Sequence, residues 1–234
     1  MKKLSLISHY YNSHDKAQEL IDHLSQAEPG ILAEVELVIV DDCSDHERQL
    51  QAKGVNLKYL RVVDDIPWNQ AGCRNLGALT SIGRWHLYFD IDQKISLDGL
   101  NYVVTHCDGL APDVMYYFMV NDFVDSNTNE QLTIHPNTFM VNANTFRMHG
   151  MYDEDFAGNY GYEDLYLPYL WERNGQVRAI IGQESFFTDQ KFKTTSLTRD
   201  LEPNKIKSTQ KMLEGIKRPK NFIRFEWKIQ SIIS

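Results

Sequence analysis

The sequence predicts an α/β protein built on a central, mostly parallel sheet flanked by helices, with a C-terminal helical extension. Two observations lead to this prediction. Strand-like and helix-like patterns alternate through the first half of the 234-residue chain, and this order builds a parallel sheet through right-handed crossovers. Polar or acidic residues also follow three of the predicted strands, and ligands gather at the carboxyl ends of parallel strands.

The elements follow in chain order. Leu4–Ser8 is a short apolar strand, and apolar residues at helical spacing from Ala17 to Leu24 predict a helix that ends at Pro29-Gly30. Apolar and β-branched runs predict the further strands, and helical spacing predicts the further helices. The strands are expected over residues 35–40, 57–62, 85–89, 114–120 and 137–141, and the helices over 69–82 and 163–173.

Charge is distributed unevenly along the chain. Residues 1–190 hold 13 Lys and Arg against 28 Asp and Glu, a net −15, whereas residues 191–234 hold 11 against 4, a net +7. An acidic body of this kind excludes a general nucleic-acid binder. The three cysteines (Cys43, Cys73 and Cys107) are odd in number and scattered, and no apolar run approaches the roughly 20 residues of a membrane span. We therefore expect a cytoplasmic protein.

Two carboxylates follow the aromatic strand that ends in Tyr88-Phe89. Asp90 and Asp92 are two positions apart, so on an extended backbone they point the same way. A hard divalent cation accepts such oxygen ligands, with phosphate oxygens completing its shell. The alternative is that the pair simply begins a turn.

Five segments carry a family resemblance, in the order 5–12, 38–45, 72–77, 90–92 and 156–164. They read Ser-Leu-Ile-Ser-His-Tyr-Tyr-Asn, Val-Ile-Val-Asp-Asp-Cys-Ser-Asp, Gly-Cys-Arg-Asn-Leu-Gly, Asp-Ile-Asp and Phe-Ala-Gly-Asn-Tyr-Gly-Tyr-Glu-Asp. On these segments the chain resembles family-2 glycosyltransferases with the GT-A fold, which move a sugar from a nucleotide diphosphate to an acceptor. The resemblance implies a GT-A domain over 1–190, with a nucleotide-binding half over about 1–95 and an acceptor half over about 96–190. Residues 191–234 form a basic extension.

The resemblance also implies a donor site and a metal, Mn²⁺ or Mg²⁺, bound by the Asp-x-Asp motif. Asp92 is the direct ligand, whereas Asp90 reaches the ribose or a metal-bound water. Asp41 and Asp42 can accept a hydrogen bond from an imide N–H, which uracil has and cytosine lacks, so a UDP-sugar is favoured. Arg74 either reaches the base or a phosphate, or pairs with Asp41 or Asp42. The expected donor-binding residues are Ser8, His9, Tyr10, Asp41, Asp42, Arg74, Asp90, Ile91 and Asp92.

The Glu163-Asp164 pair is implied to be the catalytic end of the site. In inverting relatives the second acid is the general base that deprotonates the acceptor hydroxyl, which gives Asp164 this role and makes the enzyme an inverting hexosyl- or pentosyltransferase. The alternative is that both acids favour the first turn of a helix. Trp68, Tyr160, Gly161 and Tyr162 are expected to shape the acceptor pocket.

Two departures from the family pattern concern the metal and the first strand. Many relatives carry a metal-binding His after the Glu-Asp motif, but every His of this chain lies at or before His149. Asp189 stands at a comparable distance downstream and is a suitable oxygen ligand, or else a surface residue. The usual Pro-Thr after the first strand is replaced by Ser8-His9.

In the extension, apolar residues from Phe222 to Ile233 recur at roughly helical spacing among basic ones. A basic amphipathic helix of this kind packs on the acidic body, lies peripherally on the inner face of a membrane, or contacts a polyanion. The acceptor is left open between a glycan, a lipid-linked glycan and a modified nucleic acid.

Two other functions compete with glycosyl transfer. A nucleotidyltransferase should have a Gly-rich loop after its first strand, and residues 8–12 contain no Gly. A non-catalytic nucleotide-sugar or glycan-binding module would not need both Asp92 and Asp164.

Overall fold

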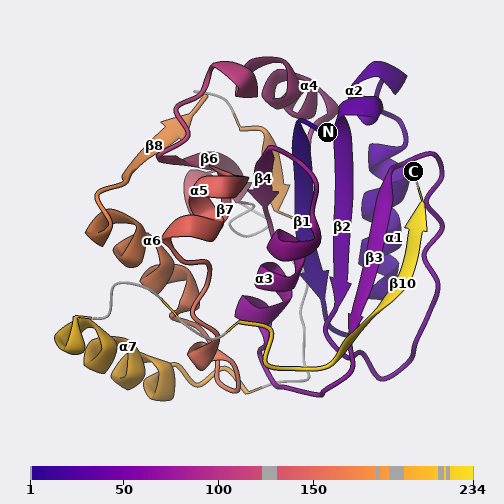
Figure 1. Cartoon of the computed structure of the whole chain (residues 1–234). Helices are drawn as coiled ribbons and strands as arrows, with labels where there is room; N and C mark the ends of the chain where they lie inside the picture. The colour runs from indigo at the N-terminus through magenta and orange to yellow at the C-terminus, as the bar shows by residue number, and fades with distance from the viewer. Residues whose placement is uncertain are drawn as a thin grey trace.

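A ten-stranded sheet with helices on both faces forms the body of the computed structural model, which describes residues 2–122, 131–182, 185–189, 198–215, 219 and 222–233 (Figure 1). The strand order is β10-β3-β2-β1-β4-β7-β6-β9-β5, and β8 pairs with β6 beside β9. The strands are β1 (Leu4–Tyr10), β2 (Val35–Asp41), β3 (Leu57–Val62), β4 (Trp85–Tyr88), β5 (Gln93–Ile95), β6 (Val114–Asp122), β7 (Gln131–Asn142), β8 (Val177–Ile181), β9 (Phe187–Asp189) and β10 (Trp227–Ile233).

The sheet has a parallel half and a mixed half. β3, β2, β1 and β4 are parallel neighbours, as the alternation of strands and helices predicts. β7 then runs antiparallel to both β4 and β6, and β8 and β9 run parallel to β6. The carboxyl ends of β1, β2 and β4 therefore meet at one edge of the sheet.

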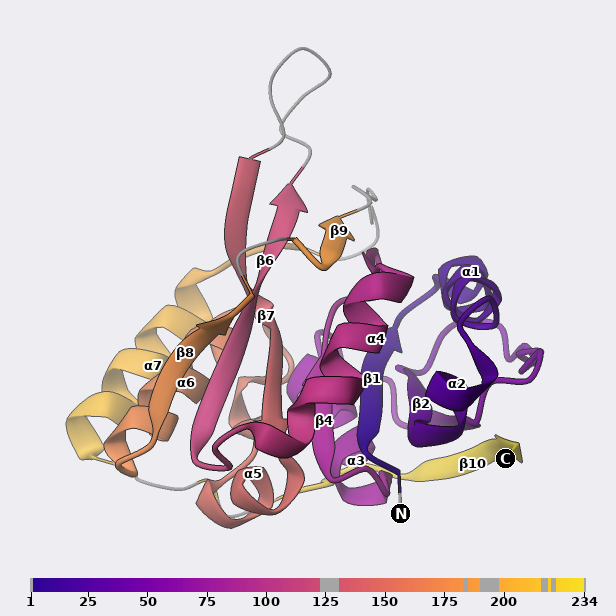
Figure 2. The same ribbon diagram turned by 90° about the horizontal axis from the view of Figure 1, so that it is seen from above.

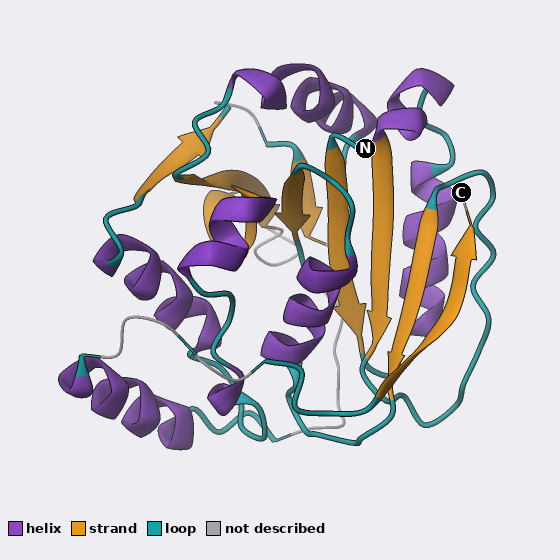
Figure 3. Ribbon diagram, viewed as in Figure 1, coloured by secondary structure: helices purple, strands orange, loops and turns teal. Residues whose placement is uncertain are grey.

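The helices cover the sheet in two layers (Figures 2 and 3). Buried residues of α1, α4 and their neighbours form one core with one face of the sheet, and those of α3, α5 and α6 form another core with the opposite face. The helices are α1 (His14–Leu24), α2 (Pro29–Glu34), α3 (Gln70–Thr80), α4 (Leu97–His106), α5 (Ala143–His149), α6 (Glu163–Arg173) and α7 (Glu202–Glu214), with short 3₁₀ turns η1 (Cys107–Gly109) and η2 (Glu154–Phe156).

The structure confirms most predicted elements and corrects one helix end. The strand over 57–62 and the helix over 163–173 have the predicted bounds. Pro29, expected to end the first helix, instead begins α2. Proline suits the first position of a helix, where its missing N–H would have no partner in any case.

The C-terminal extension is helical only in its first part. The prediction of a helix over Phe222–Ile233 is wrong, because Trp227–Ile233 is β10, which pairs antiparallel with β3 at the sheet edge (Figure 1). An unpaired sheet edge offers a row of backbone donors and acceptors, and pairing with it outweighs a loose helical spacing. The predicted boundary at 190/191 lies outside the described residues.

The extension packs on the acidic body, as one of the three alternatives predicts. Arg224 pairs with Asp155 at 2.7 Å, and Lys228 pairs with Glu47 at the same distance. Phe225 packs against α3 so closely that a Cβ on Gly72 would lie 2.5 Å from its ring, so this position requires glycine. Among the described residues, no helix is both long and apolar enough to cross a bilayer.

Candidate active site

The carboxyl edge of β1, β2 and β4 gathers the predicted site residues. The strand register places Tyr10 beside Asp41 and Ile7 beside Tyr88, so Asp90 emerges from β4 near the ends of the other two strands. Asp164 comes from a different part of the chain, the first turn of α6. The polar strand ends and the Glu-Asp motif are therefore brought to one edge by the fold.

A cleft of about 370 Å³ lies at this edge. It contains one Asp of the Asp-x-Asp motif, both acids of the Glu-Asp motif and all four residues expected on the acceptor side. Its described lining consists of Trp68, Gln70, Asp90, Asn137, Tyr160, Gly161, Tyr162, Glu163, Asp164, Leu165, Arg199 and Leu201.

The floor of the cleft holds a buried ion pair between Asp90 and Arg74. Nη2 of Arg74 donates to Oδ1 of Asp90 at 2.5 Å, and Nη1 donates to the Tyr152 hydroxyl at 2.7 Å. Nδ2 of Asn137 donates to the other Asp90 oxygen at 3.1 Å. Burial, the largest single influence, would raise the pKa of Asp90, but Arg74, His135, His9 and the hydrogen bond from Asn137 together hold that pKa below its usual value. Arg74 therefore pairs with Asp90 rather than with Asp41 or Asp42, the alternative stated above.

The Asp-x-Asp motif begins a turn, which is the alternative that the sequence left open. The backbone turns here, and the Gln93 N–H donates to the Asp90 carbonyl at 3.0 Å. A turn breaks the period-two alternation of an extended strand. Asp90 pairs with Arg74, and Asp92 lies within reach of the charges of both Asp90 and Asp189, whose strand β9 pairs with β5.

Asp92 and Asp189 are two acids, at or beside the paired strands β5 and β9, whose charges interact. Burial, together with the charges of Asp90 and Asp189, raises the pKa of Asp92 to about 7. Two close oxygen donors of this kind fit a hard divalent cation. Within the described part of the chain, no group of three or more His, Cys, Asp or Glu side chains could hold a metal. A cation here would therefore need further oxygen ligands from a bound molecule or water.

The donor residues predicted on β1 separate onto its two faces. Burial and the nearby charge of Arg74 lower the pKa of His9 to about 4, so His9 is neutral beside the ion pair. Tyr10 points to the opposite face, where its hydroxyl lies 2.8 Å from that of Tyr59 in the core. Ile91 also packs against the core, and Ser8 lies on the same face of the strand as Tyr10. The structure thus brings His9 to the site but not Tyr10 or Ile91.

Asp41 and Asp42 have different environments. Asp41 is fully buried in an ion pair with Arg61 and accepts the Ser44 N–H at 2.9 Å, so its oxygens have structural partners. Burial raises the pKa of Asp42 to about 7, although hydrogen bonds from Cys73 and Asn69 counter the rise. The Oδ1 atom of Asp42 has no hydrogen-bond partner among the described residues. Asp42 is therefore the acid of this pair whose buried oxygen lacks a hydrogen bond.

Glu163 and Asp164 begin α6 after a left-handed residue. Tyr162 has φ of 72°, and its carbonyl accepts the Tyr166 N–H at 2.8 Å. Burial raises the pKa of Glu163 to about 7, helped by the charge of Asp164. Burial also raises the pKa of Asp164, whereas Arg74 lowers it. Both acids line the cleft, and Asp164 remains half-buried with access to it.

An aromatic wall closes one side of the cleft. The rings of Trp68 and Tyr160 lie 4.5 Å apart, and Nε1 of Trp68 donates to the Thr198 carbonyl at 3.0 Å. The Arg199 guanidinium stacks on the Tyr160 ring at 5.6 Å. Sequence reasoning missed Arg199 and Asn137 because neither belongs to a motif with recognisable spacing.

Asn204 of α7 fixes the loop that carries the aromatic residues. It is fully buried, and its Nδ2 lies 2.9, 2.9 and 2.8 Å from the carbonyls of Phe156, Asn159 and Gly161. The side chain thus ties the C-terminal extension to the segment that leads into Glu163-Asp164. A residue directly after a proline in a polar helix gave no sequence signal for this contact.

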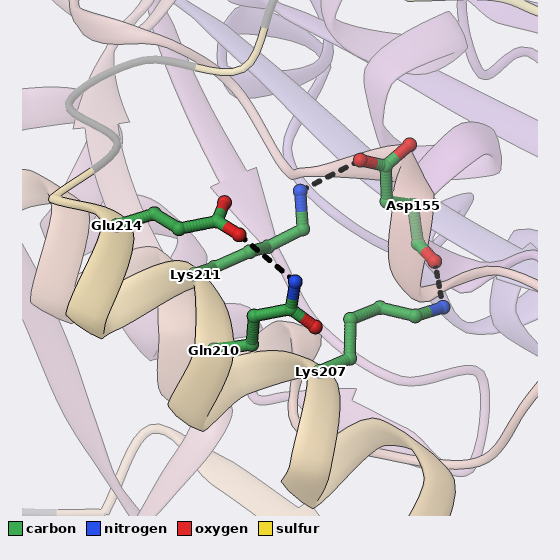
Figure 4. A pocket seen from close by; sticks show the side chains of 5 residues that line it. All are labelled: Asp155, Lys207, Gln210, Lys211 and Glu214. Carbon is green, nitrogen blue, oxygen red and sulfur yellow. Dashed lines mark hydrogen bonds and ion pairs between the residues drawn. The ribbon is translucent and has the colours of Figure 1, made fainter.

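A second, polar cavity of about 390 Å³ lies between α7 and η2 (Figure 4). Lys211 donates to Oδ2 of Asp155 at 2.6 Å, and Lys207 donates to the Asp155 carbonyl. Gln210 donates to Glu214 at 2.9 Å on the same helix. Figure 4 shows both lysines directed toward Asp155. These two contacts hold α7 against η2.

Comparison with solved structures finds the same fold. S. aureus TarS (residues 1–349) in complex with UDP-GlcNAc superposes with a TM-score of 0.66 at 18% identity, covering 86% of this chain and 63% of TarS 1–349. TarS 1–349 in complex with UDP gives 0.59 at 19% identity, covering 80% and 60%. The chain thus spans less than two thirds of the length of these structures, and it has the GT-A fold that the sequence motifs predict. No protein-family model and no curated protein sequence matches it.

Proposed function

We propose that this chain is a glycosyltransferase that moves a sugar from a nucleotide diphosphate donor to an acceptor hydroxyl. The observation that carries the proposal is the cleft in which Asp164, the Arg74–Asp90 pair and the Trp68–Tyr160 wall meet at the carboxyl edge of the sheet. Ligands of open α/β sheets bind at this edge. Catalytic sites typically contain acids whose pKa is shifted by burial and by neighbouring charges, as the pKa values of Glu163 and Asp164 are.

A UDP-sugar is the favoured donor. The TarS structures of the same fold are complexes with UDP-GlcNAc and UDP. Asp42 would accept the uracil imide N–H through Oδ1, the oxygen that has no hydrogen-bond partner among the described residues. His9, which is neutral beside Arg74, would face the diphosphate side without adding charge.

Asp92 and Asp189 are the residues proposed to hold Mn²⁺ or Mg²⁺. A bound divalent cation would supply Lewis-acid stabilisation of the departing diphosphate. Asp90 is a weaker candidate ligand, because Arg74 and Asn137 already engage its two oxygens. Its role in the proposal is to hold Arg74 and Asn137 at the floor of the cleft.

Asp164 is the proposed general base. The acceptor oxygen attacks the anomeric carbon, its proton passes to the Asp164 carboxylate, and the bond from that carbon to the phosphate oxygen breaks with its electron pair on the diphosphate. Attack from the face opposite the leaving group inverts the anomeric configuration. Glu163, whose pKa is about 7, lies beside Asp164 and would take up part of the protons released in the site.

The test is the thermal stability of the protein with UDP, GDP, CDP and dTDP, each with and without Mn²⁺. A nucleotide at a hundred times its dissociation constant adds about 2.7 kcal/mol. For a domain of this size that raises the melting temperature by roughly 5–10 °C. We expect a shift with UDP that requires Mn²⁺.

The matched variants are Asp92→Asn and Asp98→Asn, the second an exposed acid in the first turn of α4. Asp92→Asn should abolish the Mn²⁺-dependent part of the shift, whereas Asp98→Asn should keep it. A shift with a different nucleotide would replace the uridine preference and keep the reaction class. The absence of a shift with all four would contradict the proposed donor site.

A further inference from the structure

A further hollow, called here the outer groove, borders the cleft at Asp164. It has a volume of about 570 Å³ and lies between α6 and the strands β6, β7 and β8, which are neighbours in the sheet (Figure 2). Asp164 and Leu165 line both the outer groove and the cleft. The two hollows therefore meet at the proposed general base.

The described lining of the outer groove is mainly aliphatic. Ile134, Leu165, Val177 and Ile180 each expose between 47% and 53% of their surface, although they stand together in one concave site. Aliphatic side chains held half-open in a concavity favour an apolar ligand, because covering them removes apolar surface from water. Pro136 and Pro168 add further apolar surface without polar side-chain atoms.

Three polar groups of the outer groove, Arg178, Glu172 and Tyr117, are paired with one another. Arg178 is the only Lys or Arg among the described residues that line it, and its Nε donates to Glu172 at 2.7 Å. Arg178 also hydrogen-bonds the Tyr117 side chain. A polyanionic ligand would have to compete with Glu172 for this guanidinium, whereas an apolar chain would not.

The position of Asp164 determines how an acceptor must lie. The reacting hydroxyl has to come within hydrogen-bond reach of the Asp164 carboxylate. In the proposed arrangement the cleft, which at about 370 Å³ is near the small end for ligand sites, holds the sugar end of the donor and the reacting end of the acceptor. The remainder of the acceptor therefore extends into the outer groove.

We infer that the outer groove binds an apolar segment of the acceptor, so that the acceptor is an amphiphile whose alkyl or aryl chain lies against Val177 and Ile180 while its hydroxyl reaches Asp164. This inference rests on the proposed function, because it assigns the acceptor class of the same site. It selects, from the acceptor classes that the sequence left open, one with a lipid-like part.

The experiment compares two probes that share one head group. Methyl β-D-glucoside and n-octyl β-D-glucoside differ only in their alkyl chain, and both are titrated by ligand-observed NMR below the micelle concentration of the octyl compound. The octyl glucoside should bind at least about tenfold more tightly, because its chain is removed from water in the groove. The dissociation constant of UDP is measured in the same samples.

Variants locate the binding. Ile180→Glu and Val177→Glu place a charge in the groove at half-exposed positions, so folding should tolerate them, and circular dichroism checks that it does. Both should reduce octyl glucoside affinity to that of methyl glucoside and leave UDP affinity unchanged. Ile232→Glu is the matched control, an exposed isoleucine on the edge strand β10, and should bind like the wild type.

Three results would overturn the inference. Equal affinity for both glucosides would remove the apolar subsite, and an equal loss in Ile232→Glu would reveal non-specific detergent binding. A wild-type dimer that Ile180→Glu makes monomeric in light scattering would place a second copy in the groove. Failure of UDP to bind would instead contradict the proposed function, so the two failures are distinguishable.

Discussion

The Arg74–Asp90 pair sets the electrostatics of the candidate site at the scale of single residues. Arg74 is fully buried, and its charge lowers the pKa of His9, Asp90 and Asp164 together. A buried guanidinium is stable here because Asp90, Asn137 and Tyr152 accept its hydrogen bonds. The pair is therefore both a structural element of the floor and the source of the charge pattern of the cleft.

Removing Arg74 should be costly. Arg74→Ala leaves Asp90 without its cation and opens a cavity, so we expect the free energy of unfolding to fall by about 3–5 kcal/mol in urea titrations. The matched control is Arg84→Ala, whose ion pair with Asp108 at 3.1 Å is about half exposed and should contribute less than about 1 kcal/mol. Equal losses in the two variants would show that Arg74 has no special role.

Glu163 should make stability depend on pH. Its pKa rises from 4.5 to about 7 on folding, so the folded state holds the proton more tightly. The resulting stabilisation is fully present below pH 4.5, declines above it, and is lost as the pH rises through 7. Relative to Glu163→Gln, the wild type should lose on the order of 3 kcal/mol between pH 4 and pH 8.

The measurement is urea unfolding at intervals of one pH unit. Glu28→Gln, at an exposed position, is the control and should follow the wild type across the whole range. If Glu163→Gln followed the wild type as well, the carboxyl of Glu163 would not be desolvated in the folded protein.

At the scale of elements, sequence patterns predicted what local periodicity determines. The β4 strand, the α6 helix and the parallel order of β1, β2 and β4 follow from apolar spacing and were confirmed. The strand β10 was not predicted, because it depends on a partner distant in sequence, and the turn at Asp90 was predicted only as an alternative. The Gln93–Asp189 register and the free edge of β3 have no signature in the segments themselves.

The α7 helix likewise depends on contacts distant in sequence, because a single side chain, Asn204, connects it to the site. Asn204→Ala removes the donor to three carbonyls of the 156–161 loop. We expect faster amide hydrogen exchange over residues 157–162, and a turnover number roughly 10- to 100-fold lower with little change in UDP affinity. Thr209→Ala, on the exposed side of α7, should leave both readouts unchanged. Unaltered exchange in Asn204→Ala would show that the loop is held by other contacts.

At the scale of the whole molecule, the extension joins the two halves of the fold. It leaves the acceptor side through α7, passes Glu154, which accepts the Ile223 N–H at 2.9 Å, and ends as β10 beside β3 (Figure 1). Composition predicted its positive charge, and the ion pairs of Lys228 with Glu47 and of Arg224 with Asp155 neutralise part of that charge within the fold. The route of the chain depends on tertiary contacts, which composition cannot encode.

The site as a whole was predicted better than its details. The motifs placed Asp90, Asp164, Trp68 and Tyr160 at one site, and the structure brings them into one cleft. Tyr10 was wrongly expected there, because strand alternation turns its ring to the core. Each motif thus predicted where a strand or helix ends or begins. The direction of a side chain depends instead on its packing against residues distant in sequence.

The most direct test of the central claim is the release of UDP from a panel of UDP-sugars by the wild type and by Asp164→Asn, with UDP affinity measured for both. General-base catalysis predicts a rate about 10²–10⁴-fold lower in Asp164→Asn, with unchanged UDP affinity and an inverted anomeric product in the wild type. An equal rate in the two proteins, or a product with retained configuration, would contradict the assignment of Asp164 as the base of an inverting glycosyltransferase.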